Sequence, residues 1–495
     1  MGVIPSFIKP VVASAWLLAQ ANPARVAVIL LAALYACYLP QSGYTALHYD
    51  ANTYWELGRQ YGKTGAFEFT SFSNSMRGYL FPLLLAPFAI AGPHIGLSPI
   101  ELMRPLGVLI AALFFGALAP ALAQAINGPK GPVVPLVRRL LFGALGFAFW
   151  RDYFNFSLSD FPALFALCLA LWVLLNQKGI LASLLAGIAL GAAMNMRPVF
   201  VAALPFAAVL SFMACPPQSS KHSLTDNPKR WFQWVALLAG LVLVLAPQSY
   251  INQTHFNSST PFVLARSSPN GEGLYLKQLS WGLQYQKYET NIGADYPTVD
   301  MNFVDPIGNS LLRSTGGLQL KNTLSYLELA ANQPVAILGV WLRHLFNGMD
   351  LQYPTPYIKE VYIPSWPLAW LNYSVWLGGV GMLIASAKRV RPHARVYLAL
   401  AALIMPCLAA LPVAVECRFF VPLHMLLCAA VAFGAHPIRA WHASSSIRRV
   451  SWAALYIVFV SACFMMSAYT QGCLENGPRK LFSLTQITNL PVVEG

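Results

Sequence analysis

Apolar stretches of roughly 15 to 22 residues recur along most of the chain and alternate with shorter polar segments. A helix that crosses a membrane needs about 20 mostly apolar residues, because it must traverse about 30 Å of hydrocarbon with its backbone hydrogen bonds satisfied internally. The pattern predicts eleven such helices, over residues 24–39, 105–126, 133–150, 161–175, 180–196, 199–214, 231–250, 368–387, 396–413, 420–435 and 450–468. We therefore expect an all-α polytopic membrane protein.

The apolar stretch over residues 79–92 is too short to be counted with these helices. As a helix of about 14 residues it rises about 21 Å, less than the hydrocarbon thickness, and it contains Pro82 and Pro87. Counting it as a crossing would also move every later basic loop to the other side of the membrane. We expect it to form a re-entrant or interfacial helix on the outer side, accompanied by juxtamembrane helices in the outer loops.

Charge sets the expected orientation. Of the 495 residues, 57% are hydrophobic and 10% charged, against about 25% charged in soluble domains, which excludes a soluble or disordered protein. The net charge of +14 does not indicate nucleic acid as a partner, because cations gather in alternate short loops, as cytoplasmic loops do. These cations include Arg138, Arg139, Lys178, Lys221 and Arg439. The N-terminus is then cytoplasmic and the C-terminus outside, with Arg138 and Arg139 extending to the cytoplasmic surface.

Hydropathy divides the chain into four segments. Residues 1–250 form an N-terminal transmembrane core, and its first outer loop, 40–104, carries the first candidate catalytic residue. Residues 251–367 form a large outer loop, 368–469 the C-terminal transmembrane helices, and 470–495 an outer tail. All sizeable loops lie outside, so we expect the chemistry there.

The first outer loop begins with an acidic residue close to the membrane, Asp50. A carboxylate there can accept a proton from a substrate hydroxyl, while Tyr54 and Trp55 can stack on the face of a sugar. His48 and Glu56 complete this candidate acceptor site. The alternative is a solvated carboxylate that caps a short interfacial helix.

A second acidic candidate, Asp160, lies at the outer edge of an apolar helix. An ionised group is unfavourable there unless it is paired or functional. Pro162 in the first turn makes an ordinary capped helix start the competing interpretation.

Three arginines lie on the outer side, against the positive-inside trend: Arg77 before the 79–92 stretch, Arg197 between two apolar helices, and Arg418. Guanidinium groups at headgroup depth suit the phosphate of a lipid. The alternatives are interface anchoring for Arg77 and lipid headgroup contact for Arg197 and Arg418. For Arg418 an internal pair with Glu416 is a further alternative.

Arg343 and His344 lie on an apolar stretch, 334–346, near the end of the large loop. Together with the tyrosines of that loop they are candidates for binding an acceptor glycan. The same aromatic residues could instead form a small core for the loop itself.

In order and type, these signals resemble the GT-C glycosyltransferase superfamily, particularly the branch with protein O-mannosyltransferases and the lipid A aminoarabinose transferase. The resemblance covers roughly residues 24–215 and 367–437. It rests on His48-Tyr49-Asp50, Arg77-Gly78-Tyr79-Leu80-Phe81-Pro82, Leu158-Ser159-Asp160, Arg197-Pro198 and Glu416-Cys417-Arg418-Phe419-Phe420-Val421-Pro422.

The resemblance implies a GT-C-like fold in the bacterial inner membrane with a periplasmic active site. It implies transfer of a sugar from a polyprenyl-phosphate donor, among the membrane lipids, to a hydroxyl of a glycan, lipid or protein, with inversion at the anomeric carbon. Asp50 would act as general base and Asp160 would orient the acceptor, while Arg77, Arg197 and Arg418 would hold the lipid phosphate.

Metal dependence stays open. Many relatives carry two acids close together in the first loop, whereas Asp50 is followed by Ala51 and Asn52. A divalent cofactor, Mg²⁺ or Mn²⁺, therefore lacks the acidic pair that would support it. The eight cysteines show no metal-ligand spacing, so no metal ligand is assigned.

Two other functions remain as alternatives. One is an O-antigen polymerase or ligase that uses pyrophosphate-linked glycans. The other is a transporter, which typically has broken helices at the midplane and internal repeats. The concentration of acids at one surface argues against the transporter.

Overall fold

The computed structural model describes residues 21–126, 132–176, 179–213, 228–266, 273–363, 365–389, 393–434 and 445–480. Three of the cations used to orient the chain, Lys178, Lys221 and Arg439, lie outside these residues. The structure is mostly helical and divides into two compact units. Unit 1 comprises Met1–Leu274, Gly378–Ala410 and Phe419–Ala435, and unit 2 comprises Tyr275–Leu377, Leu411–Arg418 and His436–Gly495.

Within the described residues, five helices are long and apolar enough to cross a membrane, and each overlaps an expected span. The remaining six of the eleven expected spans are not confirmed. Five of them correspond to apolar helices of at most 17 residues, which rise about 26 Å and fall short of the hydrocarbon thickness. The sixth is a 15-residue helix that contains Arg138 and Arg139. The five long helices are Pro23–Gln41, Pro99–Ile126, Trp231–Phe256, Trp366–Ala387 and Ser446–Gly472.

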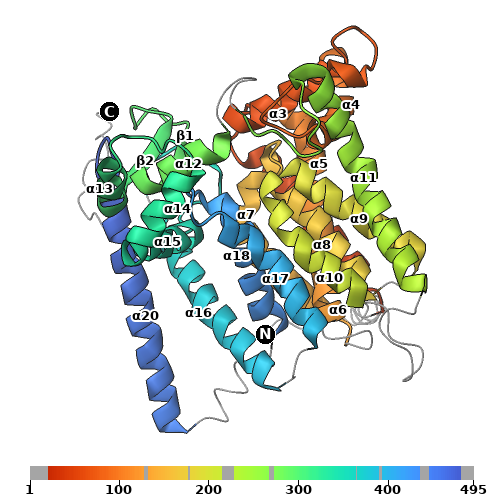
Figure 1. The fold of residues 1–495 in the computed structure, drawn as a ribbon. Coiled ribbons are helices and arrows are strands. Elements are labelled where there is room, and N and C mark those ends of the chain that lie inside the picture. Colours follow the sequence, from red (N-terminus) through yellow and green to blue (C-terminus); the bar gives the residue numbers. More distant parts are fainter. Residues whose placement is uncertain are drawn as a thin grey trace, which may run out of the picture. The chain divides into compact units, whose positions relative to one another are not determined.

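Unit 1 is built from helices (Figure 1). Short 3-10 turns join several of them, at Leu39–Gln41, Phe69–Ser71, Arg151–Asn155 and Pro198–Ala203. The helices are α2 (Pro23–Tyr38), α3 (Tyr49–Gln60), α4 (Leu80–Ile95), α5 (Pro99–Leu113), α6 (Ala119–Ile126), α7 (Leu136–Trp150), α8 (Asp160–Asn176), α9 (Ile180–Met196), α10 (Leu204–Met213), α11 (Pro228–Phe256), the later part of α16 (Trp366–Arg389), α17 (Ala394–Ala409) and α18 (Val421–Phe433).

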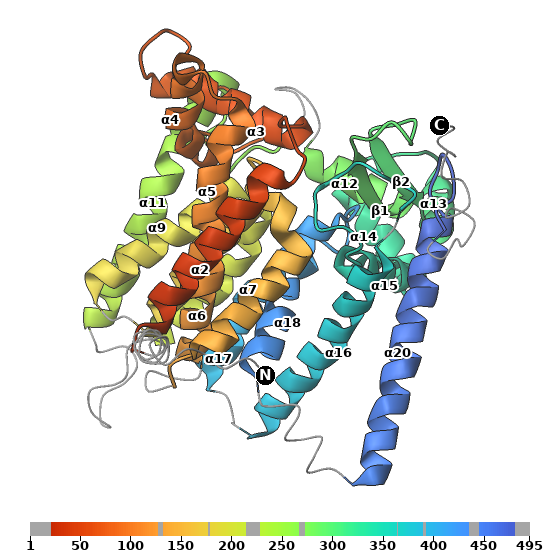
Figure 2. The same ribbon diagram turned by 180° about the vertical axis from the view of Figure 1, so that it is seen from behind.

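Helix α4 starts and ends at the same end of unit 1. At its start, the amide of Leu80 donates to Oδ1 of Asn195 near the end of α9, at 2.9 Å. Just beyond its end, Arg104 on α5 donates to the carbonyl of Tyr44 at 2.7 Å and to Oδ1 of Asn155 at 3.2 Å. Figures 1 and 2 both show α3 and α4 together at this end. Helix α4 therefore does not run through unit 1, and its re-entrant or interfacial position in a membrane stays a prediction.

Arg139 corrects one expectation from the sequence. Instead of extending to the surface, it is 4% exposed. It donates to the carbonyls of Val134 at 2.9 Å and Gly116 at 2.8 Å. Gly116 lies in a π-helical turn, Phe114–Leu118, between α5 and α6. Because the regular α-helical hydrogen-bond pattern is interrupted there, a buried guanidinium can satisfy the carbonyl.

Unit 2 contains a small sheet besides its helices, so the expectation of an all-α chain is wrong in this region. Strand β1 (Tyr285–Asn291) pairs antiparallel with β2 (Asp300–Val304) and parallel with β3 (Tyr357–Ile358). Met301 and Phe303 alternate inward on β2 and pack in a buried cluster with Ile358. The sheet lies beside helices of the same unit (Figure 2), namely α12 (Leu274–Gln284), α13 (Pro306–Ser314), α14 (Thr323–Asn332), α15 (Pro334–Met349), the start of α16, and α20 (Ser446–Gly472).

A buried ion cluster ties β1 to the chain that follows α20. Glu289 contacts Nζ of Lys287 at 2.6 Å and Nη2 of Arg479 at 3.0 Å. Burial alone would raise the pKa of Glu289, but the two cations outweigh it and hold the pKa below its ordinary value. Breaking such a cluster would leave an uncompensated buried charge, which is strongly destabilising.

Helices α9 and α11 pack closely through glycines. A Cβ at Gly187 would overlap the carbonyl oxygen of Leu237, and one at Gly240 would overlap the carbonyl oxygen of Leu184. Small residues allow this approach of two backbones, as is common between membrane helices.

We predict that Gly187→Ala or Gly240→Ala destabilises the protein by about 1–3 kcal/mol, because the added methyl forces the helices apart. The matched control is Gly381→Ala on α16, where no atom lies within 4 Å of the added carbon. The control should be neutral or slightly stabilising, since Ala favours a helix. Thermal unfolding in detergent measures the difference, and equal melting temperatures for the three variants would contradict the packing.

Candidate functional site

Asp50 forms an ion pair with Arg77. Helix α3 begins at Tyr49, whose φ of 41° lies in the left-handed region that is unfavourable for a bulky residue. His48 takes the N-cap position through its backbone, so Asp50 does not cap the helix. Instead, Oδ1 of Asp50 lies 2.6 Å from Nη2 of Arg77, with side-chain exposures of 28% and 24%. Both groups are close to the surface and within reach of a ligand.

Tyr54 connects this pair to the start of α8. The guanidinium of Arg77 lies over its ring, 5.2 Å from the centroid. The hydroxyl of Tyr54 lies 3.1 Å from Oγ of Ser159, the residue before Asp160. Tyr54 is only 4% exposed, so its ring is fixed by packing and gives the guanidinium of Arg77 a rigid aromatic surface to lie against.

Asp160 forms the second ion pair, with Nη1 of Arg197. Its side chain is 2% exposed and that of Arg197 is 17% exposed. Neither carboxylate oxygen has a hydrogen-bond partner of good geometry among the described residues, so the ion pair is the principal charge compensation there. A carboxylate with this much spare acceptor capacity can receive hydrogen bonds from a ligand hydroxyl.

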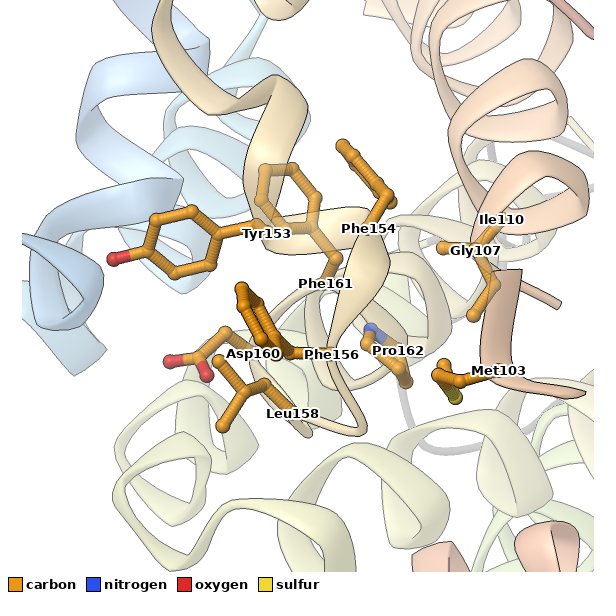
Figure 3. Close-up of a pocket in the computed structure, with 10 residues that line it drawn as sticks. All are labelled: Met103, Gly107, Ile110, Tyr153, Phe154, Phe156, Leu158, Asp160, Phe161 and Pro162. Atoms are coloured by element: carbon orange, nitrogen blue, oxygen red, sulfur yellow. The ribbon is translucent and has the colours of Figure 1, made fainter. Parts of the chain in front are cut away.

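The surroundings of Asp160 are mostly apolar. A small pocket beside it is lined by residues of α5, of the turn after α7 and of the start of α8. Figure 3 shows the carboxylate of Asp160 and the hydroxyl of Tyr153 directed to the same side, away from Met103 and Ile110. The polar groups therefore gather at one side of the pocket.

Buried amides hold the two ion pairs close together. Asn195, two residues before Arg197, accepts from the amide of Leu80 and donates to Oε1 of Gln248 at 2.9 Å. Gly78, next to Arg77, lies so close to Asn195 that a Cβ there would overlap the carbonyl oxygen of Asn195. The segment that carries Arg77 is thus fixed against the end of α9 that leads to Arg197.

Arg197 also has an aromatic neighbour. Its guanidinium lies 5.1 Å from the ring centroid of Phe419. Phe419 directly follows Arg418 in the chain, within the segment that resembles the family pattern.

Three other expected acceptor residues lie on or next to α3. Trp55 is 2% exposed and packs in a buried cluster with Ala89 and Leu102. Glu56 pairs with Arg59 at 3.1 Å on the surface, where such pairs contribute little. The ring of His48, half-buried, lies 6.5 Å from that of Phe156.

The remaining expected site residues belong to unit 2. Nε of Arg418 donates to Oε2 of Glu416 at 2.6 Å, which is the internal pair that the sequence offers as the alternative. Arg343 pairs with Asp305 at 2.7 Å. His344 is fully buried, with Nδ1 2.6 Å from the carbonyl of Leu411. Their proposed binding roles stay predictions.

Sequence reasoning missed several residues of this site. Asn195 and Gln248 carried a usable signal, since buried amides are unusual in apolar helices. Tyr153, Ser159 and Phe419 carried none, because an aromatic or hydroxyl side chain near a helix end is common.

The described residues contain no group of three or more His, Cys, Asp and Glu side chains placed to hold a metal ion. The carboxylates of Asp50 and Asp160 are instead each paired with a guanidinium, from Arg77 and Arg197. These guanidiniums would repel a metal cation.

No protein-family model, no curated protein and no solved structure matches this chain.

We predict strong energetic coupling between Asp160 and Arg197. Arg197→Gln alone should destabilise by about 3–5 kcal/mol, because it leaves a buried carboxylate uncompensated, and adding Asp160→Asn should recover part of that loss. A double-mutant cycle measured by denaturation in detergent should give a coupling energy above about 1 kcal/mol. The exposed Glu56–Arg59 pair is the control and should give about 0.5 kcal/mol or less. A coupling no larger than that of the control would refute the buried pair.

Proposed function

We propose that this protein is a membrane glycosyltransferase that moves a sugar from a polyprenyl-phosphate donor to a hydroxyl acceptor. The observation that carries the proposal is the gathering of Asp50, Arg77, Asp160 and Arg197, from four separate segments, into two neighbouring ion pairs at one end of unit 1. The proposal rests on unit 1 alone.

The two kinds of charge match the two requirements of the reaction. The acceptor oxygen attacks the anomeric carbon and loses its proton, while the bond from that carbon to the phosphate oxygen breaks. A carboxylate takes the proton, and guanidiniums stabilise the charge that develops on the departing phosphate. Asp50 is the proposed base, because it is the more exposed of the two acids.

The ion pairs suggest how the donor would activate the base. In the structure Arg77 neutralises Asp50. A lipid phosphate that binds Arg77 competes with the carboxylate for the same guanidinium. Donor binding would therefore release Asp50 to accept a hydrogen bond from the acceptor hydroxyl.

Asp160 is suited to a positioning role. Its burial and its pairing with Arg197 fix its orientation, and its oxygens retain acceptor capacity. Arg197 is the second proposed phosphate ligand, and its contact with the ring of Phe419 limits its movement. Arg418, which belongs to unit 2 and pairs with its near neighbour Glu416, is not needed for this proposal, and its phosphate-binding role stays a prediction from the sequence.

The five candidate membrane spans support a membrane location. We further propose the bacterial inner membrane, with the Asp50 end of unit 1 facing the periplasm. The acceptor would be a hydroxyl of a glycan, a lipid or a protein that reaches that face.

We predict that Asp50→Asn lowers transfer by about 100-fold or more, because an amide cannot take the proton. The measurement is mass spectrometry of cell-envelope glycans in a strain that lacks the gene and is complemented with each variant. The matched control is Glu68→Gln, which neutralises an exposed acid of the same loop and should restore the wild-type glycans. Full restoration by Asp50→Asn would remove Asp50 from the mechanism.

We predict that Arg77→Gln weakens binding of a short-chain polyprenyl monophosphate about tenfold or more, which corresponds to about 1.4 kcal/mol. The change in tryptophan fluorescence of the purified protein reports binding. Arg59→Gln, a neutralisation on the exposed side of α3, should leave the affinity unchanged. Unchanged affinity in Arg77→Gln would contradict the phosphate-binding role, and a marked preference for the pyrophosphate analogue would favour a polymerase or ligase instead.

A further inference from the structure

Unit 2 contains a separate pocket that the proposed reaction does not use. Its volume is about 250 Å³. One wall is formed by α15, with Arg343 and Phe346, and the other by the last turns of α20, with Met465, Met466 and Tyr469. The pocket thus lies between an amphipathic helix and one of the five candidate membrane spans.

The floor of the pocket is polar and internally satisfied. Oγ1 of Thr470 donates to Oδ1 of Asn347 at 2.9 Å, and Nδ2 of Asn347 donates to Oε1 of Gln286 at 3.3 Å. All three residues are at most 2% exposed. Because these groups bond to one another, the floor is preformed and defines how deep a ligand can enter.

Arg343 provides the polar edge of the pocket. Its Nε and Nη2 both donate to the carboxylate of Asp305, at 2.7 and 2.9 Å. The same carboxylate accepts from the amides of Ile307 and Gly308 at the start of α13, which fixes it in place. Neither bond to Asp305 uses Nη1 of Arg343, and the side chain is 21% exposed. The guanidinium is therefore held rigidly with one N–H₂ group available to a ligand.

The opposite side of the pocket is apolar and continues onto the exposed surface of α20. Met465 is 74% exposed, Met466 43% and Tyr469 57%. On a helix that spans a membrane, such a surface faces acyl chains. Methionine adapts its shape to a flexible chain, and a tyrosine near the end of a span is typical of the headgroup region.

A ligand for this pocket must combine a hydrogen-bond acceptor with a hydrocarbon chain. The volume is below the roughly 300–1,000 Å³ of sites that enclose a drug-sized molecule, so only part of the ligand enters. Asp305 offsets the charge of Arg343, so recognition depends on hydrogen bonding to an oxygen and not on net charge. A phosphate at the level of the lipid headgroups, with one acyl chain along α20, meets these conditions.

We propose that this pocket binds one phospholipid of the surrounding membrane, with its phosphate on Nη1 of Arg343 and an acyl chain along Met465 and Met466. This gives Arg343 a different ligand from the acceptor glycan expected from the sequence. It is independent of the proposed transfer reaction, because every residue involved belongs to unit 2.

The test is photo-crosslinking of the full-length protein in liposomes that contain a phospholipid with a photoreactive acyl chain. Wild type should be labelled on the peptide that contains Met465 and Met466, to a similar extent by phosphatidylglycerol and phosphatidylethanolamine probes. A diacylglycerol probe, which lacks the phosphate, should label it at least about fivefold less. Equal labelling by diacylglycerol would overturn the role of the phosphate.

Two variants test the pocket by different means. Met466→Trp should fill it, and the double variant Arg343→Gln with Asp305→Asn should remove the donor without leaving a buried carboxylate unpaired, while Asn still caps α13. Each should reduce labelling at least about fivefold. The control is Val458→Trp, which adds the same side chain to an exposed position elsewhere on α20 and should label as wild type.

The melting temperature of each variant confirms folding before labelling. Wild-type labelling in both folded pocket variants would overturn the proposal. Labelling that is displaced by a polyprenyl monophosphate, but not by excess unlabelled phospholipid, would also overturn it and assign the pocket to the isoprenoid carrier.

Discussion

Compensation of poorly solvated charge by an opposite charge from a distant segment is the constraint on which this structure depends. Asp160 is almost fully buried, and Arg197 reaches it from the end of α9 to form an ion pair. Asp50 and Arg77 repeat this arrangement nearer the surface. In unit 2, Glu289 is paired with Arg479 from a distant segment and also with Lys287 on the same strand. Each pair fixes the segments that carry it, so the same contacts that stabilise the fold also place opposite charges side by side.

These pairs give the proposed chemistry a physical basis. A guanidinium that is already paired with a carboxylate is oriented before the ligand binds. A phosphate that displaces the carboxylate forms hydrogen bonds with this guanidinium, and the displaced carboxylate becomes free to act as a base. The buried amides Asn195 and Gln248 keep the two pairs in register, because they hold Gly78 and the start of α4 against α9. The site is therefore a property of how helices pack, more than of any single loop.

Hydropathy predicted the positions of the helices well, because burial in lipid and burial in protein both select apolar residues. For the same reason, the eleven expected crossings are not confirmed. Helices such as α8 and α9 are apolar whether they cross a membrane or pack inside unit 1, so hydropathy alone does not give the number of crossings. Charge type and location identified Asp50, Arg77, Asp160 and Arg197 individually. Their pairing depends on long-range packing, which the periodicity of the sequence does not encode. The burial of Arg139 and the sheet of unit 2 depend on long-range packing in the same way.

The proposed site is tested most directly by the side of the membrane on which each end of unit 1 lies. Cysteines introduced at exposed Thr64, in the loop after α3, and at exposed His393, before α17, can be treated with a membrane-impermeant maleimide in intact spheroplasts, with the parent protein as background. If the Asp50 end of unit 1 faces the periplasm, position 64 should be labelled without permeabilisation and position 393 only after it. Labelling of position 393 alone in intact spheroplasts would place the Asp50 end in the cytoplasm and contradict the proposed site.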